Sequence, residues 1–465
     1  MLAGRHVTNG ATPGTVTGAT LRARLRAADQ RLGTRVTLGL VALASAGYFL
    51  FVIRFGVNVP FEDEWHMVLL LAKVHHGQLS LPILWAQHNE NRMFFAYLLM
   101  LVLDRASGFN TKVEMYASAV LLLAAVVVLL QLWRDDRWGS LLWAAPAIVV
   151  LLSLAQYAVA LQGFALAIYI ILVCLPLALW ALKLSERGNW WLCLALLLGL
   201  IASYSSLQGL ALWPAGVVYL VARGRSPKVV AAWSAGGVLT AGIYLIGLNF
   251  TQAGGGGVGA VLAAPLAAAH YLALLVGSVI PTDNFLHLGL RWLSLLGVLL
   301  LLAALAIFVY WLRSSAASEL ALPVAVIGFA VTVDVLNTLG RAQYGVSYAT
   351  SPRYVVFNLW LLAGIWLAVV RIRSHLGAPR LRPVEAAMAA IGVVVLAQVC
   401  TSVPAAIGAA HQLHAQRQQA IALVRDYQVA KPALVVRYLY PSVQVFEIRA
   451  AELRQMHLSV FASRH

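Results

Sequence analysis

Charged residues are scarce in this 465-residue sequence. They make up 11% of the chain, whereas hydrophobic residues make up 61%. Soluble globular proteins carry about 25% charged and about 45–50% apolar residues. The composition therefore excludes an ordinary soluble fold and predicts an all-α protein that crosses a membrane many times.

Cysteine is also rare, and the motifs of several enzyme classes are missing. Cys174, Cys193 and Cys400 each lie inside an apolar run, with no CxxC pair, which indicates neither a disulfide framework nor a metal site. No GxxxxGKS/T, GxSxG or HExxH sequence occurs. Their absence disfavours an NTP-driven pump, an α/β-hydrolase and a zinc protease.

Long apolar stretches predict about eleven transmembrane helices. A helix needs about 20 mostly apolar residues to cross a bilayer. Two weaker stretches, 93–107 and 259–280, could raise the number to 13, but charges or proline interrupt them, and we expect them to lie on or dip into the outer face. The eleven strong candidates are 36–56, 113–133, 139–156, 164–182, 190–204, 207–222, 229–249, 289–312, 320–339, 354–370 and 384–404.

Acidic residues are the rarer of the two charge signs, with 17 Asp and Glu against 33 Lys and Arg. Short cytoplasmic loops of membrane proteins carry an excess of Lys and Arg. Threading eleven spans from a cytoplasmic N-terminus places the basic loops at 134–137, 183–187, 223–228 and 371–382 in the cytoplasm. We therefore predict a multi-pass protein of the plasma (inner) membrane with an extracytoplasmic C-terminus. Its partners include membrane lipids and no nucleic acid.

The chain divides into three parts. Residues 1–35 form a basic cytoplasmic tail that we expect to be disordered, and residues 36–404 form the membrane domain. Residues 405–465 form a small extracytoplasmic segment, in which helical stretches flank a short strand or turn at 433–446. The outer loops of the membrane domain are 57–112, 250–288 and 340–353.

Three consecutive acids, Glu62, Asp63 and Glu64, follow the first span and precede Trp65. Adjacent carboxylates at an apolar edge repel one another and are partly desolvated, and both effects raise at least one pKa. A carboxylate in this position suits the role of a general base that accepts a proton from a hydroxyl. The alternative is a solvated acidic turn that caps the following helix.

Two further polar segments combine cations with aromatic residues. His88, Glu90 and Arg92 belong to a QHNENR run, and a histidine and an arginine at this depth could hold a lipid phosphate, although interfacial snorkelling explains them equally well. Outer loop 340–353 is unusual because it carries two arginines against the orientation bias, which points to an anionic ligand or to ion pairs with Asp334 or the acidic triplet. The residues of interest in and beside this loop are Arg341, Tyr344, Arg353 and Tyr354.

Smaller polar insertions lie at the outer ends of other spans. Gln162 and Tyr204 are examples, and Ser206 and Gln208 lie in the same insertion as Tyr204. Hydroxyl, amide and aromatic groups on one face suit a sugar. Each of them alone is more often a helix cap or an ordinary loop residue.

This combination resembles the GT-C superfamily, the integral membrane glycosyltransferases that use polyprenyl-phosphate sugars. The hallmark of that superfamily is an acidic pair or triplet in the first outer loop, a position filled here by Glu62, Asp63 and Glu64. The segments HNENR and GRAQYGVSYATSPRY also look like those of bacterial membrane proteins grouped with the superfamily. The large C-terminal periplasmic domain of some members is missing.

The resemblance implies a mechanism. Asp63, or Glu64 as second choice, would deprotonate an acceptor hydroxyl, which attacks the anomeric carbon of the donor sugar with inversion. Arg341, Arg353, His88 and Arg92 would bind the donor phosphate. Some members hold a divalent cation at the acidic motif and others need none. In this sequence such a cation would lie at Asp63 and Glu64. The remaining candidates for substrate binding are Glu62, Trp65, Glu90, Tyr344, Tyr354, Gln162 and Tyr204.

The resemblance also implies the partners: a polyprenyl-phosphate-linked sugar donor and a lipid-linked or cell-envelope glycan acceptor. Two alternatives stay open. A flippase or transporter of a lipid-linked saccharide also needs basic and aromatic residues around a cavity, although such proteins usually place ionisable groups inside the spans, where Asp334 is the clear acid. An O-antigen-type polymerase or ligase joins saccharides with arginines and a histidine in an outer loop.

Overall fold

The structure is a computed structural model that describes residues 18–135, 141–249, 257–282, 286–376 and 378–462. Within these ranges the protein is almost entirely helical, which confirms the prediction of a polytopic helical membrane protein. The strands in the described residues are two short ones, β1 (Gln87–His88) and β2 (Asn91–Arg92), which form an antiparallel hairpin.

Nine helices of the described residues are long and apolar enough to cross a membrane, or ten if one bent pair counts as a span. Each predicted span corresponds to a helical segment, but 190–204 and 207–222 form helices of only 10–17 residues. These two are α9 (Asn189–Ser203) and the 3-10 turn Leu207–Ala211 followed by α10 (Leu212–Ala222). The nine long segments are α1 (Gly18–Phe55), α5 (Thr111–Asp135), Leu141–Ala160 with α6 (Ala145–Leu151) and α7 (Tyr157–Ala160), Gly163–Leu184 with α8 (Leu166–Leu184), α11 (Pro227–Leu245), α14 (Leu290–Arg313), α15 (Ala321–Arg341), α16 (Val355–His375) and α17 (Ala378–Arg425).

The two weak stretches do not form straight spans. The first becomes α4 (Phe94–Ser107), whose 14 residues extend about 21 Å, less than the about 30 Å of a bilayer core. The second becomes α12 (Gly257–Ala263) and α13 (Pro265–Gly277), which are bent by 108° against each other. Pro265 begins α13 because proline cannot donate the hydrogen bond that would continue α12 through the bend.

The two ends of the chain are more helical than the sequence predicted. Helix α1 begins at Gly18, so residues 18–35 of the tail are helical, and residues 1–17 lie outside the described ranges. Helix α17 runs through Pro404 to Arg425, so the expected boundary between the membrane domain and the C-terminal segment lies inside one helix. Its 48 residues extend about 72 Å, far more than a bilayer requires.

Of the strand or turn expected at 433–446, the strand does not form, and a turn at 439–442 separates two helices. This region forms α18 (Pro432–Tyr438) and the start of α19 (Val443–Gln455). Proline occupies the first turn of α18, where its missing N–H is not needed, and Ser442 caps α19 by accepting a bond from Val445 N. Burial of Phe446 against the rest of the protein outweighs the β-propensity of the valines and tyrosines.

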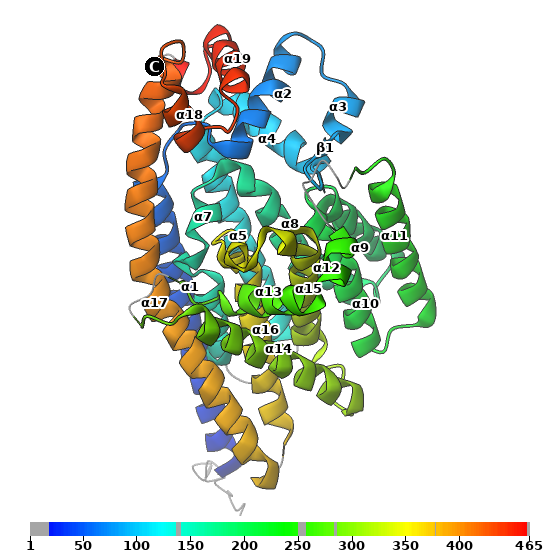
Figure 1. Ribbon diagram of the computed structural model, residues 1–465. Helices are drawn as coiled ribbons and strands as arrows, with labels where there is room; N and C mark the ends of the chain where they lie inside the picture. Colours follow the sequence, from blue (N-terminus) through cyan, green and yellow to red (C-terminus); the bar gives the residue numbers. More distant parts are fainter. Residues whose placement is uncertain (1–17, 136–140, 250–256, 283–285, 377, 463–465) are drawn as a thin grey trace, which may run out of the picture.

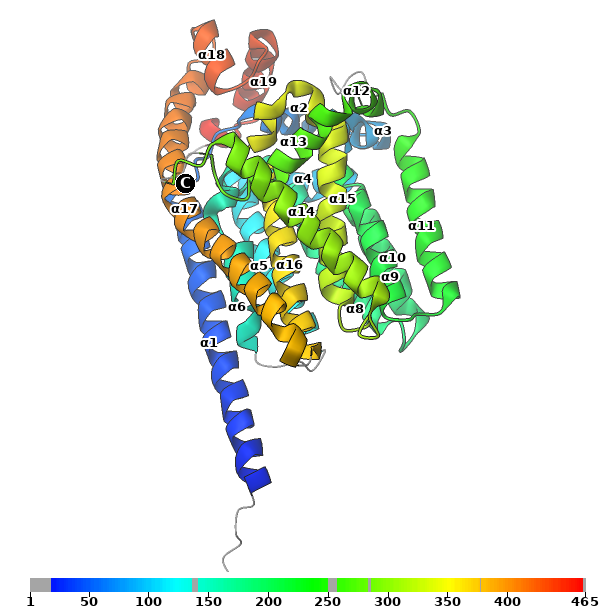
Figure 2. The same cartoon turned by 60° about the horizontal axis from the view of Figure 1, so that its bottom comes forward.

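The polar loops gather at two ends of the bundle. Figure 1 shows α2 (Trp65–His75), α3 (Leu81–Trp85), α4, β1, α18 and α19 together at one end, with the start of α1 at the other. In Figure 1 and Figure 2, α1 and α17 run side by side along one flank of the bundle. The basic loops contact each other at the end away from the acidic triplet: Arg225 pairs with Glu186, and His375 pairs with Glu319.

The centre of the bundle holds paired polar groups. The hydroxyls of Tyr48 in α1 and Tyr169 in α8 lie 2.8 Å apart, and Tyr169 donates to Gln156 Oε1 at 3.3 Å. Gln398 in α17 donates to Ser153 Oγ at 2.8 Å. Because a buried polar group without a partner is costly, these bonds fix how α1, α8 and α17 lie against one another.

Helices α13 and α14 cross with almost no space between their backbones. A Cβ atom on Gly277 would lie 1.8 Å from Leu293 O, and one on Gly297 would lie 1.7 Å from Ala273 O. Both distances are far below a van der Waals contact, so only glycine fits at either position. The crossing places α13 beside the loop that follows α15.

Candidate functional site

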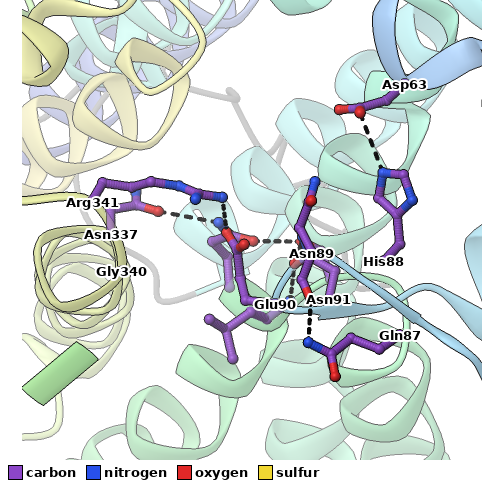
Figure 3. A network of polar contacts seen from close by, with 12 residues as sticks. Asp63, Gln87, His88, Asn89, Glu90, Asn91, Asn337, Gly340 and Arg341 are labelled. Carbon is purple, nitrogen blue, oxygen red and sulfur yellow. Dashed lines mark hydrogen bonds and ion pairs between the residues drawn. The ribbon is translucent and has the colours of Figure 1, made fainter. Parts of the chain in front are cut away.

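A cavity of about 140 Å³ lies at the end of the bundle that carries the acidic triplet. Segments that are far apart in the sequence meet there: the acidic loop, the β1–β2 hairpin, the start of α8, the turn before α10 and the loop between α15 and α16. Of the candidate residues, the cavity is lined by Asp63, His88, Glu90, Gln162, Arg341, Arg353 and Tyr354. Figure 3 shows several of them from close by.

Asp63 faces His88 across the mouth of this cavity. Its Oδ1 lies 3.3 Å from His88 Nε2, and the side chain of Asp63 is 42% exposed while that of His88 is 14% exposed. Burial acts to raise the pKa of Asp63, but interactions with His88 and Arg353 outweigh it and leave this pKa below the usual value. Asp63 is therefore ionised at neutral pH and able to accept a proton.

His66 supports this arrangement as a neutral ring. Burial, with the neighbouring charges of His88 and Arg449, lowers the pKa of His66 to about 3. Its ring centre lies 4.8 Å from that of His88 and 5.4 Å from that of Tyr97. His88 is thus held between an aromatic layer and the carboxylate of Asp63.

The hairpin presents polar side chains to the cavity from its turn. Asn89 adopts the left-handed conformation, with φ of 52°, which is common for asparagine in tight turns. Glu90, the next residue, forms an ion pair with Arg341 at the end of α15. The charge of Arg341 is therefore balanced by a carboxylate.

Arg353 has a different environment from Arg341. Its Nε donates to Ser351 Oγ at 3.2 Å, and its guanidinium lies 5.9 Å from the ring centre of Tyr348. Burial raises the pKa of Glu62, and the charge of Arg353 acts against that rise as well as lowering the pKa of Asp63. Arg353 forms no ion pair within the described residues. Arg353 thus offers a cation to the cavity beside Asp63.

Amides and hydroxyls complete the lining. Gln208 donates to Asn337 Oδ1 at 3.1 Å, and Ser206 donates to Asn91 Oδ1 at 2.8 Å. Asn89, Asn91, Ser206 and Gln208 were not among the predicted site residues, although all four lie in segments noted for their polarity. The sequence does not show which residue of such a segment faces inward, because that depends on contacts with distant helices.

Arg92 lies away from the cavity. Its Nε donates to Tyr244 O and one terminal nitrogen donates to Trp85 O, both at 2.9 Å, and the other terminal nitrogen donates to Ile246 O. Only 4% of this arginine is exposed. With its guanidinium directed at backbone carbonyls, Arg92 joins the hairpin to the end of α11.

Glu62, Glu64 and Trp65 also lie outside the cavity lining. Glu64 is buried and accepts bonds from Gly163 N at 2.6 Å and from Phe61 N at 2.9 Å. Trp65 is 0% exposed and packs edge-on against Phe446 of α19. Among the three acids, only Asp63 lines the cavity.

The remaining two candidates are aromatic. Tyr204 donates to Thr240 O at 3.1 Å and packs against Trp85 with ring centres 4.9 Å apart. Tyr344 is 43% exposed, with its ring centre 5.8 Å from the guanidinium of Arg341. Neither lines the cavity, so both contribute to packing around it.

The acidic triplet does not form a cation site with its surroundings. Within the described residues, no group of three or more His, Cys, Asp or Glu side chains is arranged to hold a metal ion. Both oxygens of Glu64 accept backbone N–H bonds, and Asp63 faces His88. Asp63 and Glu64 therefore do not converge on a shared point where a divalent cation could bind.

Two further carboxyl groups lie buried behind the triplet. Asp104 lies in the last turn of α4 and Glu114 lies in the first turn of α5, and both are 0% exposed. Burial, with the nearby charge of Glu64, raises the pKa of Asp104 to about 8. At neutral pH this group holds a proton, which removes the cost of burying a charge.

Burial of Glu64 makes the stability of the protein depend on pH. Burial raises its pKa from 4.5 to about 7. Between these two pH values, Glu64 keeps a proton in the folded protein that it releases in the unfolded chain. The contribution of Glu64 to the free energy of unfolding therefore falls as the pH rises, and this fall levels off above about pH 7. We expect a lower melting temperature in detergent at about pH 8 than at about pH 5, and a smaller difference in Glu64→Gln.

The exposed acid Glu447 provides the control, because Glu447→Gln makes the same chemical change outside the buried region. We expect Glu447→Gln to keep the pH dependence of the wild type. An equal pH dependence in Glu64→Gln and in the wild type contradicts this interpretation of Glu64.

The chain matches no family model, and no significantly similar sequence is found among curated proteins.

Proposed function

We propose that this protein is a membrane glycosyltransferase of the GT-C type that transfers a sugar from a polyprenyl-phosphate donor to a lipid-linked or cell-envelope acceptor. One observation carries the proposal: Asp63 is an ionised carboxylate in a polar cavity that also contains Arg353. A base and a cation on one cavity are the two groups that sugar transfer from a phosphate requires. By the threading predicted from the basic loops, the reaction takes place on the extracytoplasmic face.

Asp63 acts as the general base. The O–H bond of the acceptor breaks and its proton passes to the Asp63 carboxylate. The acceptor oxygen forms a bond to the anomeric carbon while the bond from that carbon to the phosphate oxygen breaks, so the configuration inverts. His88, 3.3 Å from Asp63, orients the carboxylate for this proton transfer.

The departing polyprenyl phosphate gains negative charge as its bond to the sugar breaks. Arg353 is suited to stabilise this charge, because it is not engaged in an ion pair in the described residues. Arg341 is paired with Glu90 and therefore contributes less net charge. We assign Arg353 to the phosphate and the Glu90–Arg341 pair to the sugar hydroxyls.

The amide and hydroxyl lining favours a sugar as the group that occupies the cavity. Gln162, Asn91, Ser206 and Gln208 offer both donors and acceptors and carry no charge. Phe164 and Tyr354 add aromatic surface for the ring carbons. This lining suits a single neutral sugar attached to a charged phosphate.

A second, larger cavity of about 550 Å³ offers room for the prenyl chain. It is lined by uncharged residues of segment 347–355, which also carries Arg353, and by residues 404–412 of α17. Tyr348 and Ser351, which contact Arg353, belong to this lining. We assign the lipid part of the donor to this cavity and the phosphate to Arg353, which lies between this cavity and the smaller one.

The test is sugar transfer by the purified protein in detergent, with a panel of radiolabelled polyprenyl-phosphate monosaccharides and a crude envelope acceptor. Transfer of one sugar supports the proposal. Movement of a lipid-linked saccharide across proteoliposomes without transfer supports a flippase instead. Transfer that requires an oligosaccharide donor supports a polymerase or ligase.

Arg353→Ala should weaken the binding of polyprenyl phosphate by about 10- to 100-fold, because a hydrogen bond to a charged group contributes about 1.5–3 kcal/mol. Binding is measured by displacement of a fluorescent polyprenyl phosphate from protein in detergent. Arg437→Ala, which removes an exposed arginine of α18, is the control and should bind normally. Equal affinity of Arg353→Ala and Arg437→Ala contradicts the assignment.

A further inference from the structure

The C-terminal segment packs directly on the loop that carries Asp63. The backbone N–H of Glu62 donates to Leu439 O at 3.0 Å. The next turn of the chain places Trp65 edge-on against Phe446, with ring centres 5.2 Å apart and both side chains buried. Figure 1 shows α18 and α19 beside α2 at this end of the bundle. The acidic loop is therefore held from outside by residues that follow the last membrane span.

Arg417 connects α17 to this loop from inside. Only 5% of this residue is exposed. Its Nη1 donates to Leu161 O, and its guanidinium lies 5.0 Å from the ring centre of Phe61. Leu161 is two residues before Gly163, whose N–H binds Glu64. Arg417 thus contacts both segments that donate backbone bonds to Glu64, the one at Phe61 and the one at Leu161–Gly163.

The backbone of the acidic loop is strained in a way that separates its three side chains. Glu62 has φ of 48°, in the left-handed region that residues other than glycine seldom adopt. The bond from its N–H to Leu439 O helps to hold this conformation. As a result, Glu64 turns into the protein while Asp63 faces the cavity.

The charges around the loop differ between its three acids. Arg353 acts on Glu62 and Asp63 and His88 acts on Asp63, whereas Arg417 acts on Glu64 and, more weakly than Arg353, on Glu62. Three successive carboxylates repel one another, and a buried opposite charge nearby reduces that repulsion. Within the described residues, Arg417 is the cation that favours the ionised form of Glu64. At a pH at which Glu64 is ionised, loss of Arg417 leaves a buried charge without a counter-ion, which favours turning this acid outward.

We propose that Arg417 is a positioning residue for Asp63: it holds Glu62 and Glu64 against the protein, so that Asp63 alone is directed into the cavity. The role in catalysis rests on the proposed function, in which Asp63 is the general base. The structural part does not, because it concerns only the direction in which residue 63 points. Arg417 itself contacts no substrate.

Transfer kinetics test the catalytic part with three variants. Arg417→Met keeps much of the side-chain volume and loses the charge, whereas Arg417→Lys keeps the charge. We expect Arg417→Met to lower kcat by about tenfold or more with little change in KM for the donor, and Arg417→Lys to recover most of the loss. Arg425→Gln removes an exposed arginine two turns further along α17 and should behave as the wild type. Equal loss in the Met and Lys variants overturns the proposal, since it shows that the shape and not the charge matters.

Chemical labelling tests the structural part without any assay of transfer. Asp63→Cys is made in a background in which Cys174, Cys193 and Cys400 are replaced by alanine, and its reaction with a water-soluble maleimide is timed. We expect Arg417→Met to change the labelling rate by about fivefold or more, because residue 63 changes its exposure. Arg417→Lys and Arg425→Gln should leave the rate unchanged.

The two measurements separate the possible failures. If the wild type transfers no sugar but the labelling rate of the Asp63→Cys variant depends on the charge at residue 417, the proposed function fails and the positioning role stands. If transfer occurs and the labelling rate is the same in all variants, the positioning role fails and the proposed function stands. Thermal unfolding of each variant confirms that it is folded before either result is used.

Discussion

Asp63→Asn removes sugar transfer while the protein stays folded, inserted in the membrane and able to bind polyprenyl phosphate. Asparagine has the size of aspartate but cannot take a proton from a hydroxyl, so the contribution of general base catalysis, about 10²- to 10⁴-fold, is lost. The proposed phosphate site at Arg353 is untouched. The expected result is therefore a kcat at least about 100-fold lower with a similar donor affinity.

A matched substitution separates this effect from a general loss of acid. Asp426→Asn makes the same change at an exposed position of the C-terminal segment, and we expect it to retain full activity. Because the pKa of Asp63 lies below its usual value, wild-type activity should stay level as the pH falls from neutral toward the ordinary range of aspartate. Activity retained in Asp63→Asn would falsify the assignment of the base, and Glu64→Gln then becomes the variant to examine.

Gly297→Ala should prevent normal folding, although it adds a single methyl group. The new Cβ would lie 1.7 Å from Ala273 O, and that oxygen belongs to the backbone of α13, which cannot move without separating the helices. Overpacking of a rigid contact usually lowers the free energy of unfolding by about 1–3 kcal/mol. For so short a contact with a backbone atom, we expect a loss at or above the upper end of this range. We expect aggregation after extraction in detergent, or a clear fall in the melting temperature measured by fluorescence-detected size exclusion.

Gly242→Ala provides the comparison. Gly242 also lies inside a membrane helix, α11, but a Cβ at this position would meet no atom within 4 Å. Alanine has the higher helix propensity, so this variant should be as stable as the wild type or slightly more stable. Equal melting temperatures for Gly297→Ala and Gly242→Ala would contradict the close crossing of α13 and α14.

The membrane helices could be predicted from the sequence because the signal is local. A run of apolar residues long enough to cross a bilayer forms a helix wherever it packs, since each backbone bond is made within the run. The two shorter helices, α9 and α10, were also found as apolar stretches, but their lengths depend on the turns after Ser203 and before Leu212. The weak stretch at 259–280 was recognised as unusual, whereas its bend of 108° was not foreseeable from Pro265 alone.

The direction of the side chains in the site could not be predicted from the local sequence. Arg92 and Arg341 both occur in polar segments between the apolar stretches, and nothing in either segment distinguishes them. The difference comes from residues over 150 positions away from Arg92: the carbonyls of Tyr244 and Ile246 receive its guanidinium, while Arg341 meets Glu90 at the cavity. Side-chain direction in a loop is a property of its neighbours in space.

The directions of the three adjacent acidic side chains could not be predicted from the local sequence either. Glu62, Asp63 and Glu64 have similar chemistry, and the sequence offers Asp63 as the base with Glu64 as second choice. Their separation depends on the N–H of Gly163, which binds Glu64, and on His88, which contacts Asp63. Both partners lie outside the triplet, so the distinction exists only in the folded chain.

Helix α17 connects the acidic loop, through Arg417, to a membrane-spanning segment of the same helix. Arg417 lies 13 residues beyond Pro404, which is about 20 Å along the helix axis. A tilt of about 5° at that proline therefore moves Arg417 by about 2 Å, which is enough to break a hydrogen bond. A change that tilts the membrane-spanning half of α17, such as a change in the thickness of the bilayer, would therefore also move the residues that flank Asp63.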